Sequence, residues 1–200
     1  MQWPKQGEQL FRADADWHLN ACINCYPPLL SIVASSYREG AEVLARATAD
    51  GKATLDLAIL PIVFLYRHYL ELTIKDVIDT LRSLEGEGEG YPQHHNLKNL
   101  WSEATRLVRM HYGQRTPPEF DRVQSCIDEF EVHDPESFSF RYPTDKKGKA
   151  ALRGIKHINV RHLYETMERV SALLEGIGCD LHHKLDLISE MQSGYDPYYG

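Results

Sequence analysis

The stretch Leu55 to Leu84, LDLAILPIVFLYRHYLELTIKDVIDTLRSL, holds the longest unbroken apolar run of the chain, from Leu57 to Tyr66. Its first half is apolar all round, which predicts a buried helix against which other helices pack. The ten residues of the run are fewer than the roughly 20 that cross a bilayer. We therefore expect a core helix, and no membrane span. Its later apolar residues fall on one helical stripe: Leu70, Ile74, Val77, Leu81 and Leu84.

A second, polar stripe on the same helix is formed by Arg67, His68, Glu71 and Lys75. One interpretation is that the second half of the helix reaches the surface and presents this edge to a cleft. The other is that Arg67 pairs with Glu71 at the i, i+4 spacing, while His68 bonds a neighbouring backbone group. The sequence leaves both open.

The apolar periodicity of the remaining chain predicts further helices. Asn96 and Asn159 stand where N-caps are expected, and Asp134-Pro135 is typical of a helix end. Thr116-Pro-Pro-Glu119 has the spacing of a capping box. These signals predict an all-α fold, a bundle of about five helices.

We expect one helical domain over residues 27–193, with an N-terminal arm over 1–26 and a tail over 194–200. Trp3, Phe11 and Trp17 are expected to pin the arm to the body. Inside the domain, residues 85–93 begin EGEGEG and are predicted to be a flexible acidic linker.

Residues 137–158 are predicted to form a basic insertion, a small β-hairpin or loop. Phe138, Phe140 and Tyr142 alternate with polar residues, which is the strand signal of the chain. A polar turn over 144–148 could return this strand against residues 150–155. An isolated hairpin is marginally stable, so it is expected to lie on the helices.

Composition and charge place the chain among soluble globular proteins, with 42% hydrophobic and 26% charged residues. The first residues lack the pattern of a secretory signal, so we expect a cytoplasmic protein. The net charge is −7, but residues 141–161 carry seven basic side chains and one acidic one. Such a basic segment on an otherwise acidic chain is a candidate contact for RNA, although a solvated basic loop would show the same pattern. The basic residues are Arg141, Lys146, Lys147, Lys149, Arg153, Lys156 and Arg161.

Metal and cofactor sites have little support in the sequence. The ten histidines include no H-E-x-x-H, and His94-His95 and His182-His183 are adjacent pairs that point apart. Cys22-x-x-Cys25 lacks the second close cysteine pair of a zinc site, so whether it binds metal stays open. No nucleotide-binding loop or nucleophile elbow is present. We expect no metal and no cofactor.

Three segments together resemble the HEPN superfamily of small helical bacterial and archaeal proteins. They are YRHYLELTIK (Tyr66 to Lys75), the helix start at His95-Asn96-Leu97 with Leu100-Trp101, and DPESFSFRYP (Asp134 to Pro143). The resemblance covers roughly residues 55 to 175. It implies a helical bundle that often dimerises, a role in toxin–antitoxin or phage-defence systems and, in active members, metal-independent RNA cleavage by an Arg and a His with four to six residues between them.

The chain departs from that Arg–His spacing. Arg106 and His111 fit it, but five helical positions rotate about 140°, and His111 lies on the apolar stripe. Arg153 and His157 are one residue too close. We therefore predict a composite catalytic site of Arg67, His68, Arg153 and His157, with binding residues from the basic segment and the central helix. These binding residues are Glu71, Arg141, Lys146, Lys147, Lys149 and Arg161.

In such a site a histidine would move the proton of the 2′-hydroxyl or of the leaving oxygen, and an arginine would stabilise charge on the phosphate. The leading hypothesis is a HEPN-like toxin or defence protein that acts on RNA as a homodimer, with an antitoxin or defence protein as partner. The alternative is a non-catalytic helical module that binds a protein or nucleic acid. A wide separation of His68 and His157 would favour the alternative.

Overall fold

The computed structural model describes residues 3–23, 29–145, 147–152 and 154–193. Its described residues form five α-helices and no strand: α1 (Leu30–Ala49), α2 (Leu55–Glu85), α3 (Leu97–Tyr112), α4 (Phe120–His133) and α5 (Val160–Ser193). Two short 3-10 helices, η1 (Trp17–Leu19) and η2 (Gly113–Arg115), complete the list. The predicted all-α bundle of five helices is confirmed.

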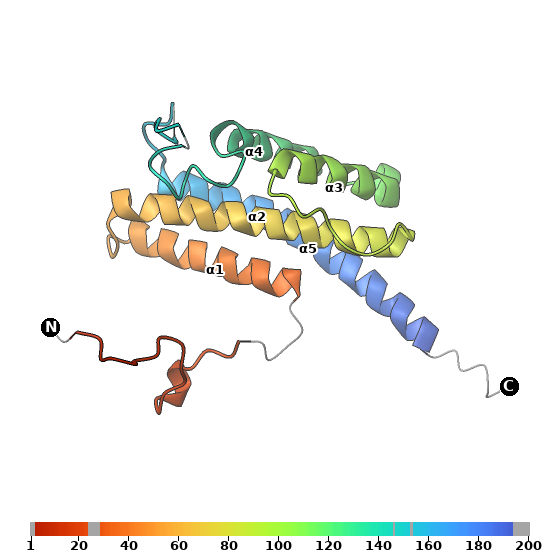
Figure 1. Cartoon of the computed structure of the whole chain (residues 1–200). Helices are drawn as coiled ribbons and strands as arrows, with labels where there is room; N and C mark the ends of the chain where they lie inside the picture. The colour runs from red at the N-terminus through yellow and green to blue at the C-terminus, as the bar shows by residue number, and fades with distance from the viewer. Residues whose placement is uncertain (1–2, 24–28, 146, 153, 194–200) are drawn as a thin grey trace.

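The central element is α2, which packs against α1, α3 and α5. Figure 1 shows α1 along one side of α2, α3 and α4 along the other, and α5 crossing behind. The core is built from the apolar stripe predicted on α2 together with the inner faces of the other helices. Leu70, Ile78 and Leu81 of α2 are completely buried, as are Leu100 and Leu107 of α3.

By length and composition alone, α2 could cross a membrane. More than half of its most apolar 18-residue window, 56%, is buried inside the bundle. Three other helices, α1, α3 and α5, pack against it, so its apolar character is explained by its central position.

Two of the expected helix caps form as predicted. The Asn96 side chain accepts a hydrogen bond from Asn99 N at 2.8 Å, and Asn159 Oδ1 accepts one from His162 N at 2.9 Å. The capping box at Thr116 does not form, because the Thr116 hydroxyl donates to the carbonyl of Gly113 and α4 begins only at Phe120.

The predicted β-hairpin over 137–158 is not formed in its described part, where a single antiparallel bridge joins Thr144 to Ala150. The first half folds into a turn instead of a strand. Ser137 has a φ of 57°, and Arg141 N donates to the carbonyl of Phe138 at 3.1 Å. A left-handed residue followed by a turn interrupts the extended path that alternation requires. Phe140 is consequently buried, while Phe138 and Tyr142 stack on each other.

The N-terminal arm is not pinned to the bundle by its aromatic residues, so that prediction is wrong. Trp3, Phe11 and Trp17 are 85%, 91% and 75% exposed. The arm instead closes on itself, with hydrogen bonds in both directions between Asp14 and Asn20. Figure 1 shows the arm separated from α1 and from the rest of the bundle.

Candidate nucleic-acid interface

Arg67 lies completely inside the protein, where two carboxylates neutralise it. Its Nη1 donates to Glu71 Oε2 at 3.2 Å, and its Nε lies 3.1 Å from Asp134 Oδ2. Its Nη2 donates to the carbonyl of His95 at 2.9 Å. Burial lowers the pKa of Arg67, and the charges of Asp134 and Glu71 oppose that effect. A single side chain therefore ties α2 to the end of α4 and to the start of α3.

Glu71 collects a second set of donors at the centre of this network. Lys75 Nζ donates to Glu71 Oε1 at 2.8 Å, and His95 Nδ1 lies 2.7 Å from the same oxygen. Burial alone would raise the pKa of Glu71, but the hydrogen bonds from Lys75 and His95 together outweigh it. The pKa of Glu71 therefore lies below its ordinary value, and the carboxylate is ionised at neutral pH.

The polar stripe of α2 is thus not a surface edge, and that expectation is wrong for three of its four members. Arg67, Glu71 and Lys75 are buried, while His68 is partly exposed. The alternative i, i+4 pairing of Arg67 with Glu71 is confirmed. The cause is tertiary: the segments before α3 and after α4 cover this side of α2, which the helical period alone does not reveal.

Asp134 connects the buried network to the surface. Its Oδ1 accepts hydrogen bonds from the backbone N–H groups of Phe138 and Ser139, at 2.5 and 2.6 Å. The side chain of Asp134 is itself buried and faces Arg67. The charge of Arg67 therefore fixes Asp134, and Asp134 shapes the turn that carries Phe138 and Arg141.

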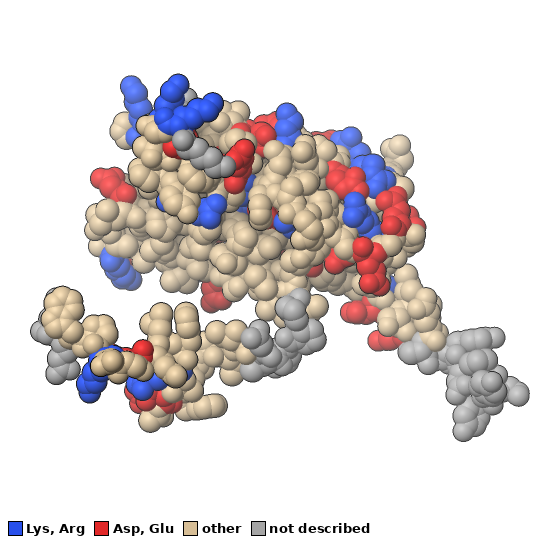
Figure 2. All heavy atoms as spheres, in the orientation of Figure 1, with Lys and Arg blue, Asp and Glu red and all other residues tan. Residues whose placement is uncertain are grey.

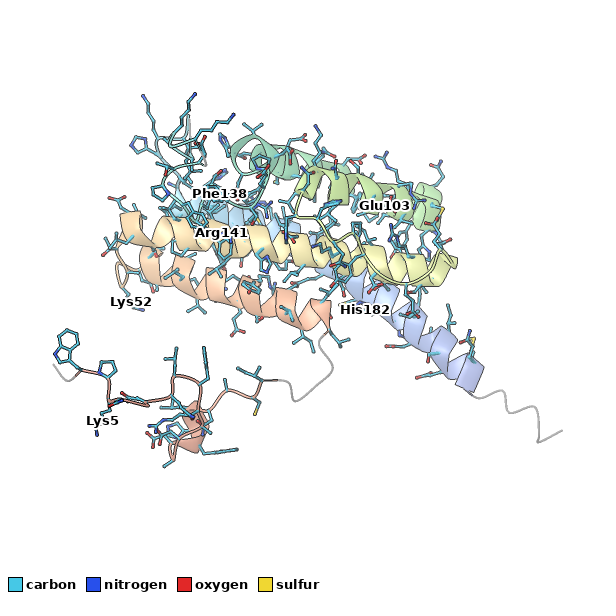
Figure 3. All side chains as sticks on the ribbon, in the orientation of Figure 1. Lys5, Lys52, Glu103, Phe138, Arg141 and His182 are labelled. Carbon is cyan, nitrogen blue, oxygen red and sulfur yellow. The ribbon has the colours of Figure 1, made fainter. Side chains whose placement is uncertain are left out.

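That turn places an arginine among aromatic rings, a group we call the aromatic platform. The Arg141 guanidinium carbon lies 5.5 Å from the ring centroid of Phe64 and 5.7 Å from that of Tyr142, which fits two cation–π contacts. Arg141 Nε also donates to the carbonyl of Ser137 at 2.8 Å. Figure 3 shows Phe138 and Arg141 over the N-terminal half of α2. The platform comprises Phe64, His68, Phe138, Arg141 and Tyr142.

His68 belongs to this platform through Phe64. The two rings are parallel within 4° at 6.1 Å between centroids, and Tyr37 of α1 meets His68 edge-on at 4.3 Å. Burial lowers the pKa of His68 below its ordinary value. Its imidazole is therefore neutral near pH 7, the form that can accept a proton. The structure brings His68 and Arg141 to one ring, Phe64.

The basic segment continues from the platform into a solvent-exposed turn. Lys147 and Lys149 are exposed, and their backbone N–H groups donate to Asp145 Oδ1 at 2.8 and 2.9 Å. Figure 2 shows blue side chains gathered at this corner of the molecule. Lys146 and Arg153 lie outside the described residues.

Arg161 does not join the platform. It lines a separate hollow of about 280 Å³ with Arg46 and Asp50 of the α1 end and Tyr164 and Glu165 of α5.

His157 lines a different cavity, between α4, residues 154–159 and the first turns of α5. Its volume is about 430 Å³, within the range of small-molecule sites, and two more histidines, His133 and His162, line it. Apolar side chains, among them Val63 and Phe140, make up much of its wall. This cavity is a second candidate site on the same half of the molecule.

The cavity and the platform lie on different sides of α2. Val63 faces the cavity, and His68 follows five positions later, which rotates it about 140° round the helix. The described contacts of His68 are with Tyr37 and Phe64. The predicted composite site is therefore gathered only in part: Arg141 reaches the ring beside His68, whereas His157 belongs to the cavity.

Other candidates are engaged in ion pairs. Arg106 contacts Glu87 and Glu103, while His111 contacts Glu85 and Lys184. Within the described part of the chain, no group of three or more His, Cys, Asp or Glu residues is placed to hold a metal ion. Cys22 is exposed, and Cys25 lies outside the described residues.

Three features of the site escaped the sequence analysis. The sequence predicts Asp134 as the end of a helix, but in the structure its side chain also shapes the following turn. The sequence places Phe64 in the apolar run and predicts a core residue, yet in the structure Arg141 lies over its ring. The Phe138–Tyr142 stack could not be distinguished from a strand in the sequence, because residues i and i+4 share one face of a strand as well as of a helix.

Comparison of the chain with protein-family models, with curated proteins and with solved structures finds no match.

Proposed function

We propose that the protein is a HEPN-like helical module that binds single-stranded RNA on the aromatic platform and the adjoining basic segment. The observation that carries the proposal is the position of Arg141 between Phe64 and Tyr142, beside exposed lysines. Proteins that hold single strands combine rings on which bases stack with cationic side chains that follow the phosphates.

The two parts of the surface would make different contributions. Stacking of a base on an aromatic side chain is worth about 1–3 kcal/mol. Tyr142 is 50% exposed, so its ring is open to such a contact. Lys147 and Lys149 would meet phosphates, and this part of the affinity falls as salt rises, because each phosphate contact releases counterions.

Cleavage of the bound RNA is the second candidate function, and the pairing of His68 and Arg141 at Phe64 favours it. His68 would take the proton of a 2′-hydroxyl, whose oxygen attacks the adjacent phosphorus and expels the 5′-oxygen of the next nucleotide. The expelled oxygen takes a proton from water, leaving a 2′,3′-cyclic phosphate and a free 5′-hydroxyl. Arg141 would stabilise the charge on the phosphate oxygens. Arg67, being buried, would support the turn and would not touch RNA.

Binding comes first in this proposal because the histidines that the sequence grouped lie apart. His157 faces its own cavity, and His68 packs against two rings. A toxin or defence role, with an antitoxin or other protein as partner, would depend on which RNA of the cell the platform binds.

The test is fluorescence anisotropy with a labelled 12-nucleotide single-stranded RNA at low salt. The Arg141→Ala variant should bind at least about tenfold more weakly, since it loses a stacked cation worth about 1.4 kcal/mol or more. Arg106→Ala is the matched control, because Arg106 is an exposed arginine that pairs with carboxylates elsewhere. Equal binding by Arg141→Ala and wild type would overturn the proposal. Absence of RNA binding by a folded wild-type protein would do so too, and would favour a protein ligand.

A further inference from the structure

The bundle leaves a second apolar surface uncovered, on α1 and the first turns of α2. Its members are Ile32, Val33 and Val43 on α1 and Leu57 and Leu60 on α2, and we call them the outer face. Exposed fractions reach 60% for Val43 and 76% for Leu57. Figure 2 shows a broad tan area with few charges over these two helices. Large exposed apolar patches mark interaction sites.

The positions of these residues on the helices turn them toward one side of the α1–α2 pair. On α1, Ile32 and Val43 lie within about 20° of each other, because eleven positions complete nearly three turns, and Val33 lies about 80° from Val43. The exposed Ser36 and Glu39 lie between Ile32 and Val43 on this side of α1. The helices run side by side, with Tyr37 against His68 and Gly40 beside Leu65. This register places Val43 level with residue 62, so Leu60 lies about half a turn and Leu57 about one and a half turns nearer the start of α2.

The N-terminal arm supplies a matching surface from the same chain. Six large apolar side chains of the arm are at least 74% exposed: Trp3, Leu10, Phe11, Trp17, Leu19 and Ile23. The hydrogen bonds described for the arm join its own residues, including those that close the loop from Asp14 to Asn20. The arm thus has local order but does not bury its aromatic residues on its own bundle.

We propose that two copies of this chain exchange arms, so that the arm of one copy covers the outer face of the other. Exchange covers both unpartnered surfaces of both copies with a single type of contact. An aromatic side chain buries about 150–250 Å². The three aromatics of each arm therefore offer about 500 Å², and the two arms with the two faces they cover give about 2,000 Å². Stable interfaces bury about 1,200–2,000 Å², so exchange reaches the size that a dimer needs.

The test uses full-length variants and measures mass by light scattering on a sizing column. The arm variant carries Phe11→Ser and Trp17→Ser, and the face variant carries Val43→Lys and Leu57→Lys. All four side chains are exposed in the single chain, so each variant should fold. Wild type should show twice the mass of the 23.0 kDa chain, and each variant alone should show the mass of one chain.

Mixing the two variants decides between ways of dimerising. The arm variant keeps an intact face and the face variant keeps an intact arm, so the mixture should form a heterodimer through one arm contact. This contact buries about half the area of full exchange, so the heterodimer should be weaker than the wild-type dimer and should increase with protein concentration. A face-to-face dimer would instead leave the arm variant dimeric, and an arm-to-arm dimer would leave the face variant dimeric. Either result overturns the proposal.

Two further readings complete the experiment. Met110→Lys is the matched control, because Met110 is an exposed apolar residue on α3, and this variant should remain dimeric. Acrylamide should quench Trp3 and Trp17 more strongly in the face variant than in wild type, with the buried Trp101 unchanged. A wild-type monomer at 100 µM, whether its arm tryptophans are quenched or protected, would reject exchange.

Discussion

Arg67 and His68 are neighbours in the chain, yet the structure gives them opposite surroundings. Arg67 is completely buried between two carboxylates, whereas His68 packs among rings at the edge of an exposed platform. One helical position rotates a side chain by about 100°, which is enough to move it from the core to the rim. The comparison shows that the chemical type of a residue does not reveal whether it supports a site or forms it.

The largest effect is expected when Arg67 is replaced by alanine. Removal of one partner leaves Glu71 and Asp134 buried with less compensation, which costs about 3–5 kcal/mol. For a chain of this size, that corresponds to a fall in Tm on the order of 10 °C. Thermal unfolding monitored by circular dichroism measures this change in Tm.

Arg106→Ala is the control for Arg67→Ala, because Arg106 also contacts two carboxylates but is largely exposed. Its effect on stability should be much smaller than that of Arg67→Ala, because solvent screens an exposed ion pair. Similar losses in the two variants would mean that burial does not separate the two arginines.

A smaller loss of stability, with a loss of RNA binding, is expected for Asp134→Asn. The amide keeps an oxygen for the N–H groups of Phe138 and Ser139, but it removes the charge facing Arg67. Leaving that guanidinium less satisfied should cost about 1–3 kcal/mol. The turn that carries Arg141 should loosen, so RNA affinity should fall as well. Chemical denaturation and anisotropy measure the two effects.

Asp145→Asn provides the control for the Asp134 variant. Asp145 also accepts backbone N–H groups through one carboxylate oxygen, but in the exposed lysine turn. It should leave global stability within about 0.5 kcal/mol of wild type. If Asp134→Asn alters stability alone and RNA binding stays intact, Asp134 does not position the platform.

The contrast between these aspartates shows how far sequence reasoning reaches. Periodicity predicted the helices, because the stripe of Leu70, Ile74 and Leu81 has one physical cause, burial on a single side. It could not predict that residues 67, 71 and 75 are buried too. That depends on the segments around His95 and Asp134, which arrive from distant parts of the chain. The position of Arg141 over Phe64 depends on the same segments.

Acid should weaken the buried network around Glu71. The pKa of Glu71 is lowered in the folded protein, so the unfolded state binds its proton first as pH falls. Stability from Glu71 is fully present above the unfolded pKa of about 4.3 and is lost as pH falls through the lower folded pKa. Denaturant unfolding at a series of pH values from 7 to 3 measures this loss. In Glu71→Gln the loss should shrink, because the glutamine does not titrate, and an unchanged pH slope would contradict the assignment.

The smallest effect on stability is expected for His68→Phe. At this residue the comparison between Arg67 and His68 becomes a test of function. His68→Phe keeps a ring between Tyr37 and Phe64, so its unfolding free energy should stay within about 1 kcal/mol of wild type. The variant has no ring nitrogen and cannot accept a proton.

A platform that only binds RNA should keep its affinity in His68→Phe, since a phenyl ring also stacks on bases. A platform that cleaves RNA should keep affinity but lose the 2′,3′-cyclic phosphate product, measured by gel analysis of a labelled RNA. His157→Phe is the control from the separate cavity, and it should leave both readings unchanged. Loss of more than about 3 kcal/mol in His68→Phe would place His68 beside Arg67 as a residue of the core, and the distinction between the two neighbours would fail.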